Sequence, residues 1–89
     1  MNLPFGLLVP GQPIITNFEE TNGIYHVDIV NPREVANISL FLTQPIPQNY
    51  AVALYFSLPP YNNMQFLGAV ANEKSSDTFS TGFPFKPDF

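Results

Sequence analysis

The sequence lacks cysteine and tryptophan and has few charged residues, which make up 11% of its 89 positions. Without cysteine the chain forms neither a disulfide framework nor a thiolate metal site, so its stability must come from apolar burial. Only Arg33, Lys74 and Lys86 are positive, and the net charge is −4. Binding to nucleic acid or to an anionic membrane surface needs clustered cations, and we therefore expect neither as a partner.

Residues suited to catalysis or metal binding are also scarce. His26 is the only histidine, and it falls on the polar face of a predicted strand, which is typical of a solvent-exposed side chain. A Ser-His-Asp site would need Asp28 or Asp77 and a serine to converge on it, and no nucleophile turn is visible. The pair Glu19-Glu20 is typical of a solvated surface, and the five glycines are too far apart for a phosphate loop. We therefore expect a non-enzymatic protein without cofactor or metal.

Proline and phenylalanine are abundant instead, with ten and nine residues. A proline inside a helix costs about 3 kcal/mol, and the spacing of the prolines favours strands over helices. Hydrophobic patterning predicts strands over residues 23–30, 36–43, 50–58, 64–71 and 77–81. The stretch 50–58 is apolar on both faces, which predicts a central strand that is covered on both sides. Gly68 predicts a bulge or a close approach of two backbones or side chains.

Turn residues separate these stretches. Asn22-Gly23 is the strongest short signal for a hairpin. Residues 59–63 predict a second hairpin loop, and residues 72–76 predict a polar turn. Asn31-Pro32 is typical of a helix start, with asparagine as the N-cap, and leaves room for about one turn.

Short strands joined by proline-rich turns predict an all-β fold, an antiparallel sandwich of two sheets. The pattern does not distinguish a jelly roll from an immunoglobulin-like topology. We expect the sandwich to span residues 1–81 and residues 82–89 to form a tail or the start of a linker, because prolines exclude that segment from a sheet interior. Some of the aromatic side chains are expected to fill the core, namely Phe41 or Phe56, Phe66 and Phe79. Others are flanked by proline and are expected to be surplus to this core, namely Phe5, Phe83, Phe85 and Phe89. We expect these residues either to serve binding or to have packed against a further domain.

From Ile38 to Phe79, with matching pieces near the N-terminus, the sequence resembles the N-terminal domain of the Hikeshi family, nuclear import carriers of seventy-kilodalton heat-shock chaperones. The resemblance rests on several pieces in a fixed order, namely Phe5-Gly6 with Val9 and Gly11, Ile38-Ser39-Leu40-Phe41-Leu42, Pro45-Ile46-Pro47, Leu54-Tyr55-Phe56-Ser57, Phe66-Leu67-Gly68, Asn72, Lys74-Ser75 and Phe79. The chain departs from the family where it has residues 48–51 in place of a glycine-rich segment and Ser75 in place of a proline.

The resemblance implies a jelly-roll-like sandwich whose apolar pockets bind Phe-Gly repeats of nucleoporins. It also implies chaperone cargo, residence in cytoplasm and nucleus, and homodimerisation through a C-terminal domain that these 89 residues do not include. The candidate residues for peptide binding are Phe41, Tyr55, Phe56, Phe66 and Leu67, with Phe83 and Phe85 of the tail as lids.

Two other hypotheses remain open from the sequence. The first is a structural or assembly sandwich whose phenylalanine-rich tail docks on a neighbouring subunit. The second is a carbohydrate-binding sandwich that uses surface aromatics, although the chain has no tryptophan and few polar partners for a sugar.

Overall fold

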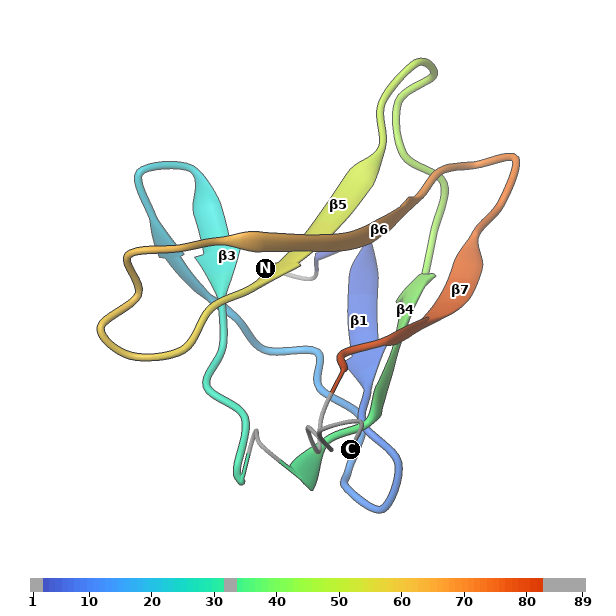
Figure 1. Cartoon of the computed structure of the whole chain (residues 1–89). Coiled ribbons are helices and arrows are strands. Elements are labelled where there is room, and N and C mark those ends of the chain that lie inside the picture. The colour runs from blue at the N-terminus through green and yellow to red at the C-terminus, as the bar shows by residue number, and fades with distance from the viewer. Residues whose placement is uncertain (1–2, 32–33, 83–89) are drawn as a thin grey trace.

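The computed structural model describes residues 3–31 and 34–82, which form seven antiparallel strands (Figure 1). The strands are β1 (Phe5–Leu8), β2 (Glu19–Thr21), β3 (Ile24–His26), β4 (Asn37–Leu42), β5 (Val52–Phe56), β6 (Gln65–Val70) and β7 (Ser76–Ser80). Within the described residues there is no helix long and apolar enough to cross a membrane. The predicted all-β, antiparallel sandwich is confirmed.

Strand β4 is the centre of a three-stranded sheet of order β1-β4-β7. The alternation expected from the sequence holds along it, since Ile38 and Leu40 are buried whereas Ser39 is partly exposed. Ser39 and Thr78 share a hydrogen bond of 2.7 Å between their hydroxyl groups on the outer face. One face of this sheet therefore belongs to the core and the other faces solvent.

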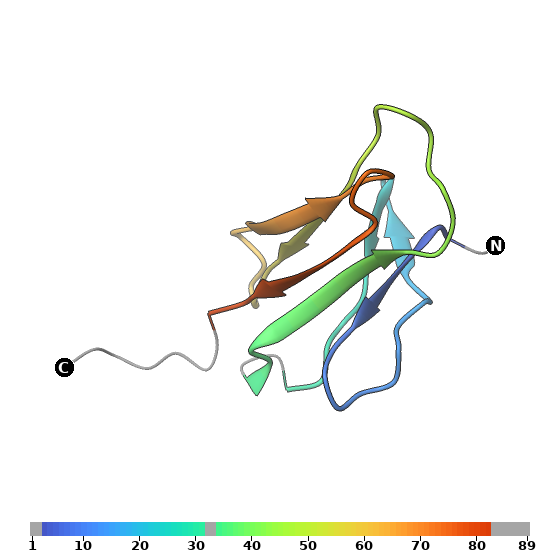
Figure 2. The same cartoon turned by 90° about the vertical axis from the view of Figure 1, so that its right-hand side faces the viewer.

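The β5–β6 hairpin forms the second layer and lies behind the three-stranded sheet in Figure 2. Its inner face carries Val70, which is only 1% exposed and belongs to the same buried cluster as Leu7 and Leu40. Gly68 permits close contact between the layers, because a Cβ at this position would lie 2.3 Å from Cε1 of Phe79. The predicted close approach at Gly68 is thus confirmed.

The β2–β3 hairpin turns at Asn22-Gly23 as predicted, with φ angles of 53° and 83°. Positive φ at both central residues is the property of a type I′ turn, for which Asn-Gly is preferred. The hairpin packs on the start of β1, where the ring centroid of Phe5 lies 5.2 Å from that of Phe18 and 5.8 Å from that of Tyr25. The expectation that Phe5 is surplus to the core was wrong, since its ring packs against the core and joins the hairpin to the sheet.

Strand β5 differs from its prediction as a central strand. Its one hydrogen-bonded neighbour in the described chain is β6, and the side chains of Ala53 and Tyr55 are exposed. Only Val52, Leu54 and Phe56 are half-buried. The outer face of this strand carries small and aromatic residues. They are apolar, which led to the prediction of burial, but they are exposed in the structure.

Two predictions between β3 and β4 need correction. The strand expected over 23–30 ends at His26, although Val27 and Ile29 beyond it still pack against the core. Asn31 has a φ of 52°, in the left-handed region, so it does not adopt the backbone conformation of an N-cap. Its carbonyl accepts a hydrogen bond of 3.0 Å from the Glu34 N–H, three residues on, and Glu34 belongs to a 3-10 turn, so the length of about one turn is as predicted. Pro32 and Arg33 of this prediction lie outside the described residues.

A side chain from the turn after β6 holds the middle of the loop between β4 and β5. The Asn72 Oδ1 accepts a hydrogen bond of 3.0 Å from the Ile46 N–H, and the Asn72 Nδ2 donates one of 2.7 Å to the Ile46 carbonyl. Ile46 itself is buried. One amide side chain thereby satisfies both backbone groups of a residue that stands between Pro45 and Pro47.

Candidate functional site

The outer face of the β5–β6 hairpin carries a pair of exposed aromatic rings. Tyr55 is 49% exposed and Phe66 is 59% exposed, and they are directly opposite in the register of the two strands. Their ring centroids are 5.3 Å apart with an interplanar angle of 61°, an edge-to-face contact. Such a pair stabilises the hairpin by about 0.5–1 kcal/mol and leaves the ring faces open to solvent.

A β-bulge turns Phe66 outward. Side chains alternate along a regular strand, so Phe66 would share the inner face with Gly68. The register shifts between Leu54, which pairs with Gly68, and Tyr55, which pairs with Phe66. Leu67 is the extra residue and packs partly buried against the core. The expectation that Phe66 fills the core was therefore wrong, because the bulge moves its ring to the outer face beside Tyr55.

The loop of the same hairpin adds two large exposed side chains, Tyr61 and Met64. Tyr61 has a φ of 65°, an uncommon conformation for a residue other than glycine or asparagine. We call the four residues Tyr55, Tyr61, Met64 and Phe66 the aromatic patch. None of them is charged, and large uncharged side chains exposed on one element are typical of a contact surface.

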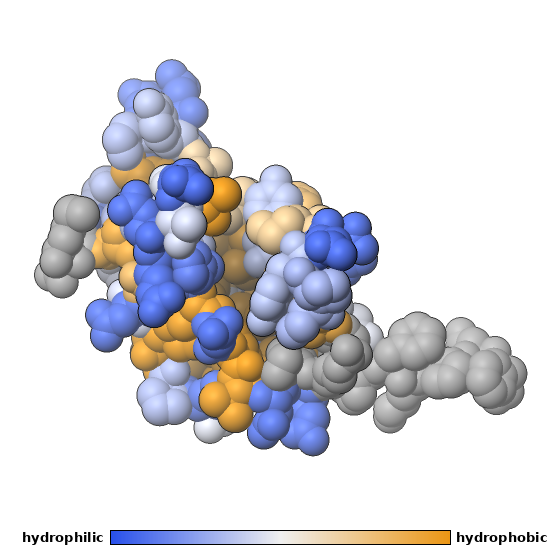
Figure 3. All heavy atoms as spheres, turned by 90° about the vertical axis from the view of Figure 1, so that its left-hand side faces the viewer, coloured by the Kyte–Doolittle hydropathy of each residue, from blue (hydrophilic) through white to orange (hydrophobic). Residues whose placement is uncertain are grey.

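Hydrophobic surface is exposed around the β2–β3 hairpin as well. Figure 3 views the side on which both this hairpin and the loop between β5 and β6 lie, and shows hydrophobic atoms open between groups of polar atoms. Ile24 and Val30 are among the large apolar residues that remain exposed. A concavity of about 380 Å³, lined by residues such as Val9, Gln12 and Val35, includes none of the predicted site residues.

The structure brings together only part of the predicted peptide-binding set. Tyr55 and Phe66 are in contact, and Phe56 and Leu67 are half-buried neighbours on the same two strands. Phe41 belongs to the other sheet, where its half-buried ring lies against Gly6. A Cβ added to Gly6 would lie 2.7 Å from the Cζ of Phe41. The proposed lids, Phe83 and Phe85, lie outside the described residues, as does Phe89.

Two members of the aromatic patch were missed from the sequence. Tyr61 stands in the predicted hairpin loop 59–63 and Met64 at the start of the predicted strand 64–71, and neither was chosen as a candidate site residue. The signal that could have identified them is the pair of large apolar side chains at the tip of a hairpin, where no core is within reach.

Polar chemistry offers little at this surface. The exposed His26 shares a hydrogen bond of 3.0 Å between its Nε2 and the Thr21 Oγ1, on the β2–β3 hairpin. Among residues 3–31 and 34–82 there is no group of three or more histidine, cysteine or acidic side chains that could hold a metal ion. What the aromatic patch can supply is apolar and aromatic contact.

Comparison with known proteins agrees with the arrangement of the strands and their motifs. The family model described as "Hikeshi-like, N-terminal domain" matches residues 8–82. Protein OPI10 of Saccharomyces cerevisiae (strain ATCC 204508 / S288c) is 28% identical over 87 residues, which cover 90% of this chain and 35% of that protein. The OPI10 homologs of Aedes aegypti and Anopheles gambiae are each 32% identical over 80 residues, which cover 83% of this chain and 40% of theirs. This chain thus spans roughly a third to two fifths of the length of these relatives, and it belongs to the Hikeshi-like N-terminal domain family.

Proposed function

We propose that this domain is a non-enzymatic binding module of a nuclear transport carrier, and that its aromatic patch binds Phe-Gly repeats of nucleoporins. The observation that carries the proposal is the exposed pair Tyr55 and Phe66, held 5.3 Å apart on a hairpin whose inner face is anchored in the core. A rigid pair of rings offers a phenylalanine of a partner both a face and an edge to pack on.

The expected affinity of one such contact is low. Burying a phenylalanine side chain contributes about 1.5–3 kcal/mol, and ordering of the peptide offsets part of this. A single repeat would therefore bind in the millimolar range. A carrier has to leave each repeat as readily as it binds, and many weak contacts along a repeat-rich chain supply the avidity.

The composition supports the same function. Charged residues make up 11% of the chain and its net charge is −4, so few charges would lose hydration when it enters an aromatic, repeat-rich environment. The aromatic patch contains no charged residue, so a neutral Phe-Gly segment would not have to desolvate a charge there.

The resemblance to the Hikeshi family extends this proposal to a longer protein that contains the domain. In such a protein the domain would act within a homodimer, formed through a C-terminal domain, that carries heat-shock 70-kDa chaperones from cytoplasm to nucleus. The module described here would supply the contact with the nucleoporins, and the chaperone contact would need the dimer.

The proposal is tested by titrating a Phe-Gly-repeat peptide into isotope-labelled protein and following backbone amide resonances. We expect shifts centred on residues 54–56 and 64–67, and none with a peptide in which serine replaces phenylalanine. The variant Phe66→Ser should lose these shifts. Ile24→Ser is a matched control, because Ile24 is also 59% exposed but lies on β3.

If millimolar peptide moves no resonance, or if Phe66→Ser binds as well as the wild type, peptide binding by the aromatic patch is refuted. In that case light scattering of the chain with and without residues 82–89 tests the assembly hypothesis, which requires an oligomer that depends on the tail.

A further inference from the structure

One edge of the three-stranded sheet is open. Strand β7 pairs with β4 on one side. On its other side the bridge between Ala71 and Lys74 ends just before the strand begins, and no strand of the described residues pairs with residues 76–80 there. The side chains of Ser76, Thr78 and Ser80 are exposed. An open edge presents a row of backbone N–H and C=O groups to which another strand can pair.

The hydrogen bonds that flank the ladder establish which residues face outward. The Leu42 N–H donates to the Ser75 carbonyl at 2.7 Å, and the Thr81 N–H donates to the Ala36 carbonyl at 2.9 Å. Bonded and non-bonded pairs alternate in an antiparallel ladder, so Asp77 and Phe79 bond to β4. The backbone groups of Ser76, Thr78 and Ser80 accordingly point away from β4.

Most devices that proteins use to protect an edge are missing from β7. Its five residues include neither proline nor lysine, and its register with β4 is regular over five consecutive pairs. The side chains on the outer face are small and would not obstruct an incoming strand.

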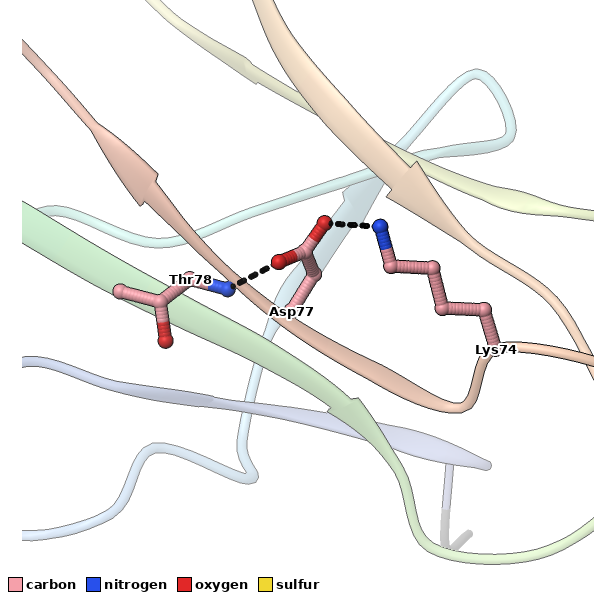
Figure 4. A network of polar contacts seen from close by, with 3 residues as sticks. All are labelled: Lys74, Asp77 and Thr78. Carbon is pink, nitrogen blue, oxygen red and sulfur yellow. Dashed lines mark hydrogen bonds and ion pairs between the residues drawn. The ribbon is translucent and has the colours of Figure 1, made fainter.

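One outward N–H is covered, and it is the central one. The Thr78 N–H donates a hydrogen bond of 2.8 Å to Oδ1 of Asp77, whose other oxygen, Oδ2, forms an ion pair of 2.6 Å with the Lys74 Nζ (Figure 4). The pKa of Asp77 lies below its ordinary value of 3.8, mainly because of the Lys74 side chain and to a smaller extent because of the Thr78 N–H. We call this arrangement of Lys74, Asp77 and Thr78 the clasp.

The outward groups of β7 are arranged symmetrically about Thr78. If a second copy approaches antiparallel with a two-fold axis at Thr78, each Thr78 pairs with the other, and each Ser76 pairs with Ser80 of the second copy. All the outward backbone groups of these three residues would then be satisfied. The two three-stranded sheets would continue as one six-stranded sheet.

We propose that the free edge of β7 is a strand-pairing site for a second copy of this chain, and that the clasp keeps it closed. In the closed state the Thr78 N–H, on which the two-fold pairing depends, donates its hydrogen bond to the carboxylate of Asp77. Losing the carboxylate exposes that N–H and opens the edge. This surface is separate from the aromatic patch, so the inference does not depend on the proposed function.

The test compares Asp77→Ala with wild type and with Asp77→Asn by sedimentation equilibrium of the whole 89-residue chain. Alanine removes the acceptor, whereas asparagine keeps a side-chain oxygen that can still accept the Thr78 N–H. We expect Asp77→Ala to associate at least about tenfold more tightly than wild type, a difference that about one net hydrogen bond accounts for. Asp77→Asn should stay close to wild type.

Amide hydrogen exchange read by NMR locates the contact. In the associated Asp77→Ala protein the amides of Ser76, Thr78 and Ser80 should become protected relative to wild type, whereas those of Tyr55 and Phe66 should not. The proposal is overturned if folded Asp77→Ala associates no more than wild type, if Asp77→Asn associates as strongly as Asp77→Ala, or if the new protection lies outside β7.

Discussion

We expect the side chain of Asn72 to contribute strongly to the stability of the loop between β4 and β5, which joins the two sheets. It makes two hydrogen bonds, of 3.0 and 2.7 Å, to the N–H and the C=O of Ile46, which is buried. The substitution Asn72→Ala removes the side-chain oxygen and nitrogen together, and leaves the partly buried N–H and C=O of Ile46 without these hydrogen bonds. Because Pro45 and Pro47 have no N–H, neither neighbour can donate a replacement hydrogen bond within this loop.

The expected cost follows from the number of bonds. An unsatisfied buried donor or acceptor costs about 1–3 kcal/mol, and water will compensate part of this at a loop, so we expect a loss of about 2 kcal/mol in the free energy of unfolding. For a domain of this size each kcal/mol lowers Tm by about 4–8 °C, which predicts a drop of roughly 8–16 °C. Thermal and denaturant unfolding followed by circular dichroism measure both quantities.

The control is Asn62→Ala in the exposed loop between β5 and β6, which loses the same atoms from an exposed side chain that forms no hydrogen bond within the described chain. It should change the free energy of unfolding by no more than about 0.5 kcal/mol. A second variant, Asn72→Asp, keeps the acceptor but places a carboxylate against the Ile46 carbonyl, and should destabilise at neutral pH at least as much as alanine. If Asn72→Ala unfolds like Asn62→Ala, the two hydrogen bonds of Asn72 do not stabilise this loop.

Three further predictions concern packing, backbone conformation and charge. Gly68→Ala places a Cβ 2.3 Å from Phe79 and should lower the free energy of unfolding by about 1–3 kcal/mol in urea, with partial rescue by Phe79→Leu. Gly23→Ala meets no atom within 4 Å, so its loss of about 1 kcal/mol should come from φ of 83° alone, and no second-site substitution of a neighbour should rescue it. The pKa of Asp77 is lowered mainly by Lys74, so this carboxylate stabilises the fold above its unfolded pKa, and the effect is lost as pH falls through the lower folded pKa. An NMR titration should show the pKa of Asp77 rising in Lys74→Ala; an unchanged pKa would contradict the ion pair.

Local patterns were sufficient to predict several elements. The alternation in β4 puts Ile38 and Leu40 on one face, and burial on that face is a consequence of the two-residue period of a strand. Asn22-Gly23 predicts its turn because few other residues adopt positive φ at two successive positions. These features depend on neighbours in the sequence, and they are the ones that the structure confirms.

The aromatic patch could not be predicted in the same way. The orientation of Phe66 depends on the extra residue Leu67 in the pairing of β6 with β5, and a one-residue shift moves a side chain to the opposite face. Sequence patterning identified Tyr55 and Phe66 as candidates but could not distinguish the core from the surface for either. Their exposure was established only by the register of the hairpin.

Contacts between distant segments were the other source of error. Phe5 seemed surplus to the core because it stands beside a proline near the N-terminus, yet its ring packs on Phe18 and Tyr25. The hydrogen bonds between Asn72 and Ile46 join residues 26 positions apart. No periodicity within one strand contains information on such pairings.

The central claim, that the aromatic patch binds phenylalanine of Phe-Gly repeats, is tested most directly by intermolecular NOEs between an unlabelled repeat peptide and the labelled chain. If the patch binds the repeats, NOEs will connect the ring protons of the peptide phenylalanine with the side chains of Tyr55 and Phe66. NOEs that instead locate the peptide ring at Phe41, at Ile24 or at the concavity beside Val9 would contradict the claim.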